Sequence, residues 1–188
     1  MGNALGIVVG FDKSVRTILM SVRSDLKACS TAPQEEQEKL YQREERRLTL
    51  NGIEPKSASQ DWGTPTADLT VSNELLRVGG ITYRHGFGVH ANSRLVFDLG
   101  GRYSTFEAAV GLPDHITSTH PASVIFRVIG DGNTLWDSGV IRAGTGSKPV
   151  RTGIQGVNQL ELVVTDAGDG IQYDHGCWLD PKLSPTTP

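Results

Sequence analysis

Residues 123–136 read SVIFRVIGDGNTLW, and this stretch decides the fold class of the 188-residue chain. Val124, Phe126 and Val128 fall on one face of an extended segment, an alternation typical of a half-buried strand. Asp131-Gly132-Asn133 then separates two apolar runs, and residues of this kind tolerate the positive φ of a tight turn. The stretch therefore predicts two antiparallel strands joined by a β-hairpin.

The same alternation recurs outside this stretch, with glycine-containing turns between the apolar runs. The alternating runs are residues 94–99, 106–110 and 159–165, and the turns are residues 100–101, 111–114 and 153–158. Short strands at this spacing predict an antiparallel β-sandwich or barrel. No sequence repeat with a period of roughly 20–50 residues occurs, which argues against a solenoid or a propeller.

The first 47 residues have a different character. Apolar residues recur at three- and four-residue spacing between Val15 and Leu26, which predicts an amphipathic helix. Pro33 and the acidic residues after it indicate the start of a second, mostly polar helix. We expect residues 1–47 to be a helical segment without a functional site of its own, since charged helices are usually solvated.

Composition excludes several classes of function. The 18 basic and 21 acidic residues give a net charge of −3, so no nucleic-acid partner is expected. The two cysteines, Cys29 and Cys177, are too few for a disulfide framework or a four-cysteine zinc site. No apolar run reaches the roughly 18 residues of a membrane span, and no signal peptide is predicted at the start of this chain. The motifs of serine hydrolases, zinc proteases and P-loop enzymes do not occur, so catalysis is not expected.

Residues 165–175 read TDAGDGIQYDH and form the densest polar cluster in the chain. Asp166, Asp169 and Asp174 fall within nine residues and are separated by glycines, an arrangement that suits a hard, oxygen-seeking cation such as calcium. A turn whose aspartates bond their own backbone has the same composition. Both interpretations stay open on the residues alone.

A second cluster is HGFGVHA at residues 85–91, where two histidines bracket a glycine-rich turn. His85 and His90 could ligate zinc, but no third ligand lies at a familiar spacing. A buried His90 that hydrogen-bonds a loop is the alternative.

Sugar sites pair an aromatic platform with polar side chains, because a sugar ring presents an apolar face and many hydroxyls. Trp62 in a loop context, together with His90, Asp174 and His175, supplies these residue types. Trp178, which follows His175 closely and precedes the final apolar run, completes the candidate set. Packing in the core is the alternative for any single tryptophan.

In their order and spacing, seven blocks of residues resemble the NPCBM domain, a carbohydrate-binding module related to family 51 modules. The blocks are SQDWG (59–63), YRHGFGVHANS (83–93), FDLGGRYSTF (97–106), VIFRV (124–128), LWDSG (135–139), LVVTDAGDGI (162–171), and Asp174-His175 with Trp178. The resemblance runs from about Leu48 to Leu183. Two departures are Cys177, where the family has an acid, and an insertion-like segment at residues 116–121.

The resemblance implies a jelly-roll β-sandwich of galactose-binding-like type at residues 48–184, followed by a short tail at 185–188. Residues 1–47 lie outside it and are interpreted as a helical N-terminal segment or the remnant of a preceding domain. The resemblance further implies a module without catalysis that binds galactose-containing or related glycans. Such modules are typically attached to bacterial glycoside hydrolases or surface proteins, which implies a larger multidomain parent, and related modules typically hold a structural calcium ion.

The leading hypothesis is therefore a non-catalytic carbohydrate-binding module. The candidate sugar-binding residues are Trp62, His90, Asp174, His175 and Trp178, and the candidate calcium ligands are Asp166, Asp169 and Asp174. The alternatives are a protein-interaction or spacer sandwich that binds no sugar and, third, an enzyme associated with glycoside hydrolysis that uses the His/Asp loop.

Overall fold

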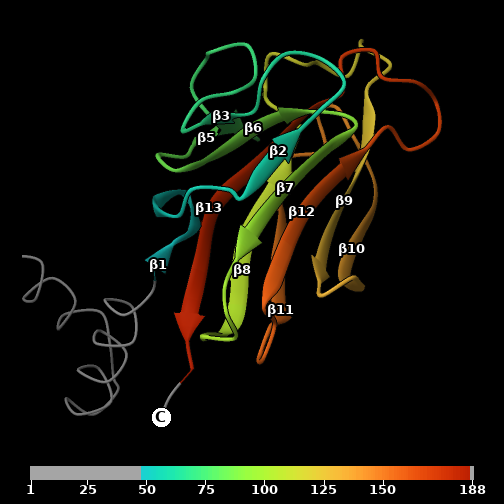
Figure 1. Cartoon of the computed structure of the whole chain (residues 1–188). Coiled ribbons are helices and arrows are strands. Elements are labelled where there is room, and N and C mark those ends of the chain that lie inside the picture. The colour runs from blue at the N-terminus through green and yellow to red at the C-terminus, as the bar shows by residue number, and fades with distance from the viewer. Residues whose placement is uncertain (1–47, 187–188) are drawn as a thin grey trace, which may run out of the picture. The chain divides into compact units, whose positions relative to one another are not determined.

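The computed structural model describes residues 48–186, which form two antiparallel sheets packed face to face (Figure 1). The first sheet contains, in spatial order, β11 (Lys148–Gly153), β8 (Tyr103–Gly111), β13 (His175–Pro185), β6 (Gly86–His90) and β3 (Thr66–Ala67), with β1 (Leu48–Thr49) paired to β13. The second contains β10 (Asn133–Arg142), β9 (Ser123–Gly130), β12 (Gln159–Thr165), β7 (Ser93–Asp98) and β2 (Ser57–Ser59). A small hairpin of β4 (Arg77–Val78) and β5 (Ile81–Thr82) and the 3-10 helix η1 (Leu50–Gly52) complete the described part.

Sequence neighbours rarely pair in these sheets, because the chain crosses repeatedly from one sheet to the other. Among the ten strands given above in spatial order, only β9 and β10 are neighbours both along the chain and within a sheet. Such crossing connections are the mark of a jelly-roll sandwich. The predicted fold class is confirmed.

The alternation seen in the sequence places one face of each central strand in the core. The strand β9 contributes Val124, Phe126 and Val128, and all three side chains are fully buried. The strands β7 and β12 contribute a further set of buried apolar side chains, namely Leu95, Phe97, Leu160, Leu162 and Val164. At about 25 cal/mol per Å² of apolar surface removed from water, this shared core is the main stabilising contribution to the sandwich.

The hairpin predicted at Asp131-Gly132-Asn133 is also confirmed. Residues Asp131 and Gly132 form a two-residue loop with φ of 48° and 81°, and Asn133 pairs with Gly130. Positive φ at both loop positions matches the twist of the flanking strands. The Asp131 carboxylate also accepts the backbone N–H of Gln159 at 2.8 Å, which connects this hairpin to the start of β12.

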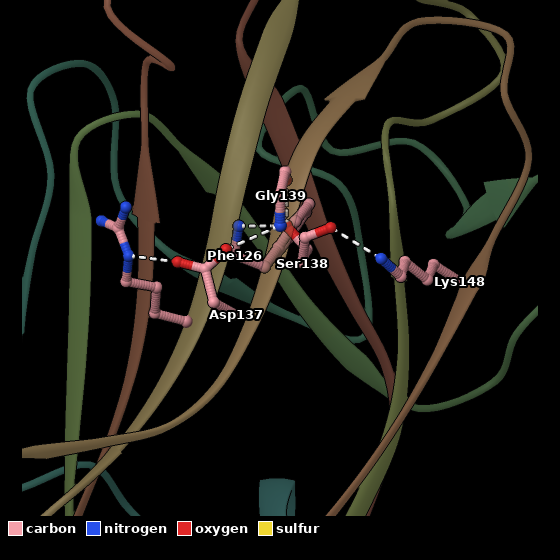
Figure 2. Close-up of polar contacts among 6 residues, drawn as sticks. Phe126, Asp137, Ser138, Gly139 and Lys148 are labelled. Carbon is pink, nitrogen blue, oxygen red and sulfur yellow. Dashed lines mark hydrogen bonds and ion pairs between the residues drawn. The ribbon is translucent and has the colours of Figure 1, made fainter.

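Figure 2 shows a cluster of polar contacts at the point where the register between β10 and β9 shifts. The Ser138 hydroxyl accepts the backbone N–H of Phe126 at 2.9 Å and donates to the carbonyl of Gly139 at 2.5 Å. Asp137 accepts the N–H of Gly139 at 2.6 Å, and Lys148 donates to the carbonyl of Ser138 at 2.6 Å. Side chains therefore satisfy backbone groups that the regular ladder leaves unpaired at the bulge.

The predicted helices at residues 1–47 lie outside the described residues. Within residues 48–186, no helix is long and apolar enough to cross a membrane. Cys177 is a buried free thiol, and burial raises its pKa well above the ordinary value.

Candidate functional site

A pocket of about 280 Å³ lies at the end of the sandwich where β13 begins. Figure 1 shows the long loop between β12 and β13 leaving the sheets at this end. The pocket is lined by Trp62, His90, Ile171, Gln172, Tyr173 and His175. These residues come from the loop after β2, the end of β6, the β12–β13 loop and the first residue of β13.

The wall of the pocket formed by His90 and His175 belongs to the first sheet. The two residues are direct cross-strand partners, so both side chains lie on the same face of the sheet. Their ring centroids are 5.5 Å apart. Backbone hydrogen bonds between β6 and β13 hold this wall in place.

His90 is buried, with 5% of its surface exposed, and its tautomer follows from its contact with the backbone. The Nδ1 atom donates to the carbonyl oxygen of Ala91 at 2.6 Å, because a carbonyl can only accept. In the neutral ring, Nε2 is then left as an acceptor. The strand that carries His90 also needs Gly88, where a Cβ would lie 2.3 Å from the carbonyl oxygen of Leu69.

Trp62 lines the pocket from the loop that follows β2. Its side chain is 53% exposed, and its ring stacks on His175 with a centroid distance of 5.9 Å and an interplanar angle of 12°. Gln60 holds the loop, since its amide donates to the carbonyl of Trp62 at 2.6 Å and accepts the N–H of His90 at 3.1 Å. Asn92, just after β6, also donates to the carboxylate of Asp61 at 3.0 Å, so two side chains fasten the loop to this part of the first sheet.

His175 is half-buried and carries a strongly shifted pKa. Burial is the main cause, and the nearby His90, His115 and His120 add to it, so the pKa falls to about 4. His175 is therefore neutral at neutral pH. A neutral imidazole has one donor and one acceptor for a ligand hydroxyl.

Asp174 lies beside the pocket but does not line it, because its side chain is completely buried. One carboxylate oxygen accepts the N–H of Ser123 at 3.0 Å, and the other has no hydrogen-bond partner. Burial raises the pKa of Asp174 to about 7; the Ser123 hydrogen bond opposes this rise, while Asp169 and Asp166 add to it. The unpartnered oxygen is an unusual feature for a buried carboxylate.

The acidic loop has part of the donor set of a calcium site. Asp169 accepts the hydroxyl of Ser123 at 2.6 Å, which brings it close to Asp174 through the same serine. Asp166 instead accepts the N–H of Gly168 at 3.1 Å, as in an aspartate turn. Among residues 48–186, no three His, Cys, Asp or Glu side chains are grouped to hold a metal ion. Calcium stays a prediction that fits the unpartnered Asp174 oxygen and would need backbone carbonyl or water ligands.

Trp178 does not belong to the pocket, and its prediction as a sugar-binding residue is wrong. It is fully buried and packs edge-on against Phe126 of the opposite sheet at a centroid distance of 5.2 Å. Successive strand residues face opposite ways, so His175 and Cys177 lie on one face of β13 and Trp178 on the other. Trp178 is close to His175 in sequence, but its side chain lies on the opposite face of the strand.

Several residues of this region were not predicted from sequence. Tyr173 is 48% exposed and lines the pocket with Ile171 and Gln172, inside a loop for which the sequence suggested only aspartates. An exposed aromatic within a polar loop was the signal that could have identified it. His115 directly precedes the insertion-like segment at residues 116–121, and His120 lies within it. Their rings approach those of His175 and Tyr173 with centroid distances of 5.5 and 4.5 Å, respectively.

Comparisons with known proteins agree with the fold. A family model described as the NPCBM/NEW2 domain matches residues 46–184. Alpha-1,3-galactosidase B of Akkermansia muciniphila is 33% identical over 125 residues, which is 64% of this chain and 15% of that protein. The chain spans between 9% and 15% of the length of the curated relatives it matches first.

Two solved structures share the fold. The CBM51 from Clostridium perfringens GH95, in complex with methyl-galactose, is 35% identical with a TM-score of 0.69, covering 73% of this chain and 99% of that one. The CBM51-2 from Clostridium perfringens ZmpB, in complex with GlcNAc, is 28% identical with a TM-score of 0.70. That likeness covers 74% of this chain and 31% of the other.

Proposed function

The chain belongs to the NPCBM/NEW2 family, and from this premise we propose that its sandwich is a non-catalytic module that binds galactose-containing glycans in the pocket of Trp62, His90 and His175. The observation that carries the proposal is the half-exposed Trp62 ring beside a neutral histidine in a pocket of about 280 Å³. A pocket of this volume accommodates a small part of a glycan rather than a long glycan chain.

The chemistry of the pocket suits a sugar ring. Trp62 and Tyr173 expose aromatic surface that can cover the apolar C–H face of a sugar. His90 offers an acceptor at Nε2, and His175 and Gln172 add polar groups for hydroxyls. An exposed aromatic next to polar side chains favours this function over a protein-interaction or spacer sandwich.

The pocket lining argues against hydrolysis at this site. Glycoside hydrolysis needs two carboxyl groups about 5–10 Å apart that flank the scissile bond. None of the six lining residues is Asp or Glu, and Asp174 is buried behind the pocket. We therefore infer that a larger parent protein, if enzymatic, carries its catalytic groups elsewhere, and that this module positions the parent on its glycan.

Calcium is proposed as a structural ion beside this pocket. Asp174 and Asp169 would supply carboxylate oxygens, and a bound cation would satisfy the unpartnered oxygen of Asp174. The ion would hold the loop that carries Tyr173 and thereby one wall of the pocket. It takes no part in contacting the sugar.

Isothermal titration with methyl-galactoside and, separately, with GlcNAc tests the proposal. We expect saturable binding of the galactoside, and Trp62→Ala should weaken it by about two- to tenfold, since aromatic stacking contributes roughly 0.5–1.5 kcal/mol. Trp62→Phe keeps an aromatic face and should lose less. Ile81→Ala, an exposed apolar residue outside the pocket, is the matched control.

Three results would redirect the proposal. Binding of GlcNAc alone would keep the module and change its sugar. Absence of binding to both sugars and to a wider glycan array at millimolar concentration would favour the spacer function. Hydrolysis of an aryl galactoside that disappears in Asp174→Ala would favour the enzyme.

A further inference from the structure

Four of the five histidines of the chain gather around one another at the pocket end of the sandwich. The Nε2 atom of His115 lies 3.3 Å from the Nδ1 atom of His175, although 60 residues separate the two in sequence. Their ring centroids are 5.5 Å apart, and the ring planes are inclined by 70°. Two imidazole nitrogens thus converge, one from the loop after β8 and one from the first residue of β13.

We propose that His115 and His175 form a binding site for a divalent transition metal such as zinc. Two nitrogens that each lie about 2.0–2.1 Å from a tetrahedral ion are about 3.3 Å from one another. The separation of the two ring nitrogens in this structure has the same value. A zinc ion bound to both nitrogens would therefore keep them at the separation seen here.

The second nitrogen of His115 is held in the manner of metal-binding histidines. Its Nδ1 atom lies 3.0 Å from a carboxylate oxygen of Glu74, so Nδ1 carries the proton and Nε2 keeps its lone pair for a metal. Such a carboxylate fixes the ring orientation and raises the basicity of the ligand. Glu74 is thus a positioning residue for His115.

The Nδ1 atom of His175 faces the Nε2 atom of His115 as a hydrogen-bond partner, so a metal would take the place of the proton between the two nitrogens. The hydroxyl of Ser72 lies 3.5 Å from the same Nδ1 atom and offers a further oxygen close to the ion. The other neighbour, His120, uses its Nδ1 to accept the N–H of Thr117 at 3.1 Å, so we assign it no role.

The site holds two imidazoles rather than a complete ligand set. In the described part of the chain, no group of three such side chains surrounds the pair, so water would fill the remaining positions. The inference is therefore a labile site with two protein ligands, fewer than the three of a catalytic zinc centre. Imidazole ligands favour zinc, copper and nickel over calcium or magnesium, which distinguishes this site from the acidic loop.

Titration calorimetry of the full chain with zinc chloride, after chelation and with excess calcium present to cover the acidic loop, tests the site. We expect one zinc ion per chain, bound at least about tenfold more weakly by His115→Ala and by His115→Asn. Glu74→Gln should weaken binding by a factor of about 10 or less, because the ligand itself remains. His85→Ala, which removes a histidine that contacts Asp68 instead, should bind zinc like the wild type.

Cobalt provides a second, spectroscopic readout with the same variants. Visible absorption of bound cobalt should appear in the wild type and vanish in His115→Ala. No zinc binding up to millimolar concentration would overturn the proposal, as would equal binding by the wild type and His115→Ala. Neither measurement uses a sugar, so the outcome is independent of the proposed glycan binding.

Discussion

Two tryptophans mark two regions of the molecule that work differently. Trp178 is fully buried between the sheets, whereas Trp62 is 53% exposed on a loop over the pocket. The core around Trp178 joins Phe106 and Phe126 of opposite sheets through edge-on contacts. The rim, which is the loop around Trp62, is held by hydrogen bonds of Gln60 and Asn92 and by the stacking of Trp62 on His175. The core should therefore set stability, whereas the proposed sugar binding would depend on the rim, so substitutions in the two should have separable effects.

The largest expected effect is the loss of Trp178. Trp178→Ala should lower the free energy of unfolding by about 3–5 kcal/mol, because it removes the largest fully buried side chain and leaves a cavity. Urea denaturation measures this change. A cost below about 1 kcal/mol would contradict the role of Trp178 in joining the sheets.

Trp62→Ala should show the opposite pattern. We expect the free energy of unfolding to change by less than about 1 kcal/mol, since the side chain is half exposed and packs only on other rim residues. The same urea experiment, run beside the sugar titration, checks this. If Trp62→Ala destabilises the protein as much as Trp178→Ala does, the division between core and rim is wrong.

The carboxyl of Asp174 lies where core and rim meet, and its pKa predicts a dependence of stability on pH. The folded pKa of about 7 lies above the ordinary value of 3.8. Below about pH 4 the carboxyl is protonated in both states, so the shift has no effect on stability. Between pH 4 and 7 the unfolded state ionises first, and the free energy of unfolding falls as the pH rises. In EDTA, Asp174→Asn should remove this part of the decline, as a series of melting temperatures across this range would show.

Calcium should act on the same carboxyl with the opposite sign. At pH 8, excess calcium is expected to raise the melting temperature of the wild type by roughly 3–6 °C, because the ion binds only the folded state. EDTA should reverse the rise, and Asp174→Asn should abolish it. A wild-type melting temperature that is the same in calcium and in EDTA would rule out the structural ion.

The bulge of β10 does not line the pocket and is expected to affect stability alone. Ser138→Ala leaves the buried N–H of Phe126 without its acceptor and should cost about 1–2 kcal/mol of unfolding free energy. Sugar affinity should stay at the wild-type value, because Ser138 does not line the pocket. A coupled loss of sugar affinity would show that the bulge and the rim are not independent.

The sequence predicted the sandwich well because its central strands obey a local rule. Val124, Phe126 and Val128 alternate on one strand, and burial follows directly from that alternation. The tight turn at Asp131 and Gly132 is equally local. The family resemblance and the structure agree on the same fold for the region that follows residue 47.

The site was harder to predict because it depends on contacts between distant segments. Trp62 and His175 stack although 113 positions separate them, and residue types alone suggested their meeting without its geometry. The prediction that Trp178 faces the pocket was wrong. The face of β13 on which a side chain lies depends on where the strand begins, and the sequence does not define that residue. The contact between His115 and His175 had no local signal, since 60 residues separate the two and the segment after His115 looked like an insertion.

The pocket has one wall on paired strands and one wall on loops, and this asymmetry has a consequence for how such modules diversify. The strand residues His90 and His175 cannot shift without breaking the ladder between β6 and β13. The segment at 166–173 can be exchanged while that ladder stays intact, since its side chains add little to the core. Grafting loops of different length onto this fixed base is therefore a practical route to laboratory lectins with altered sugar preference on an unchanged scaffold.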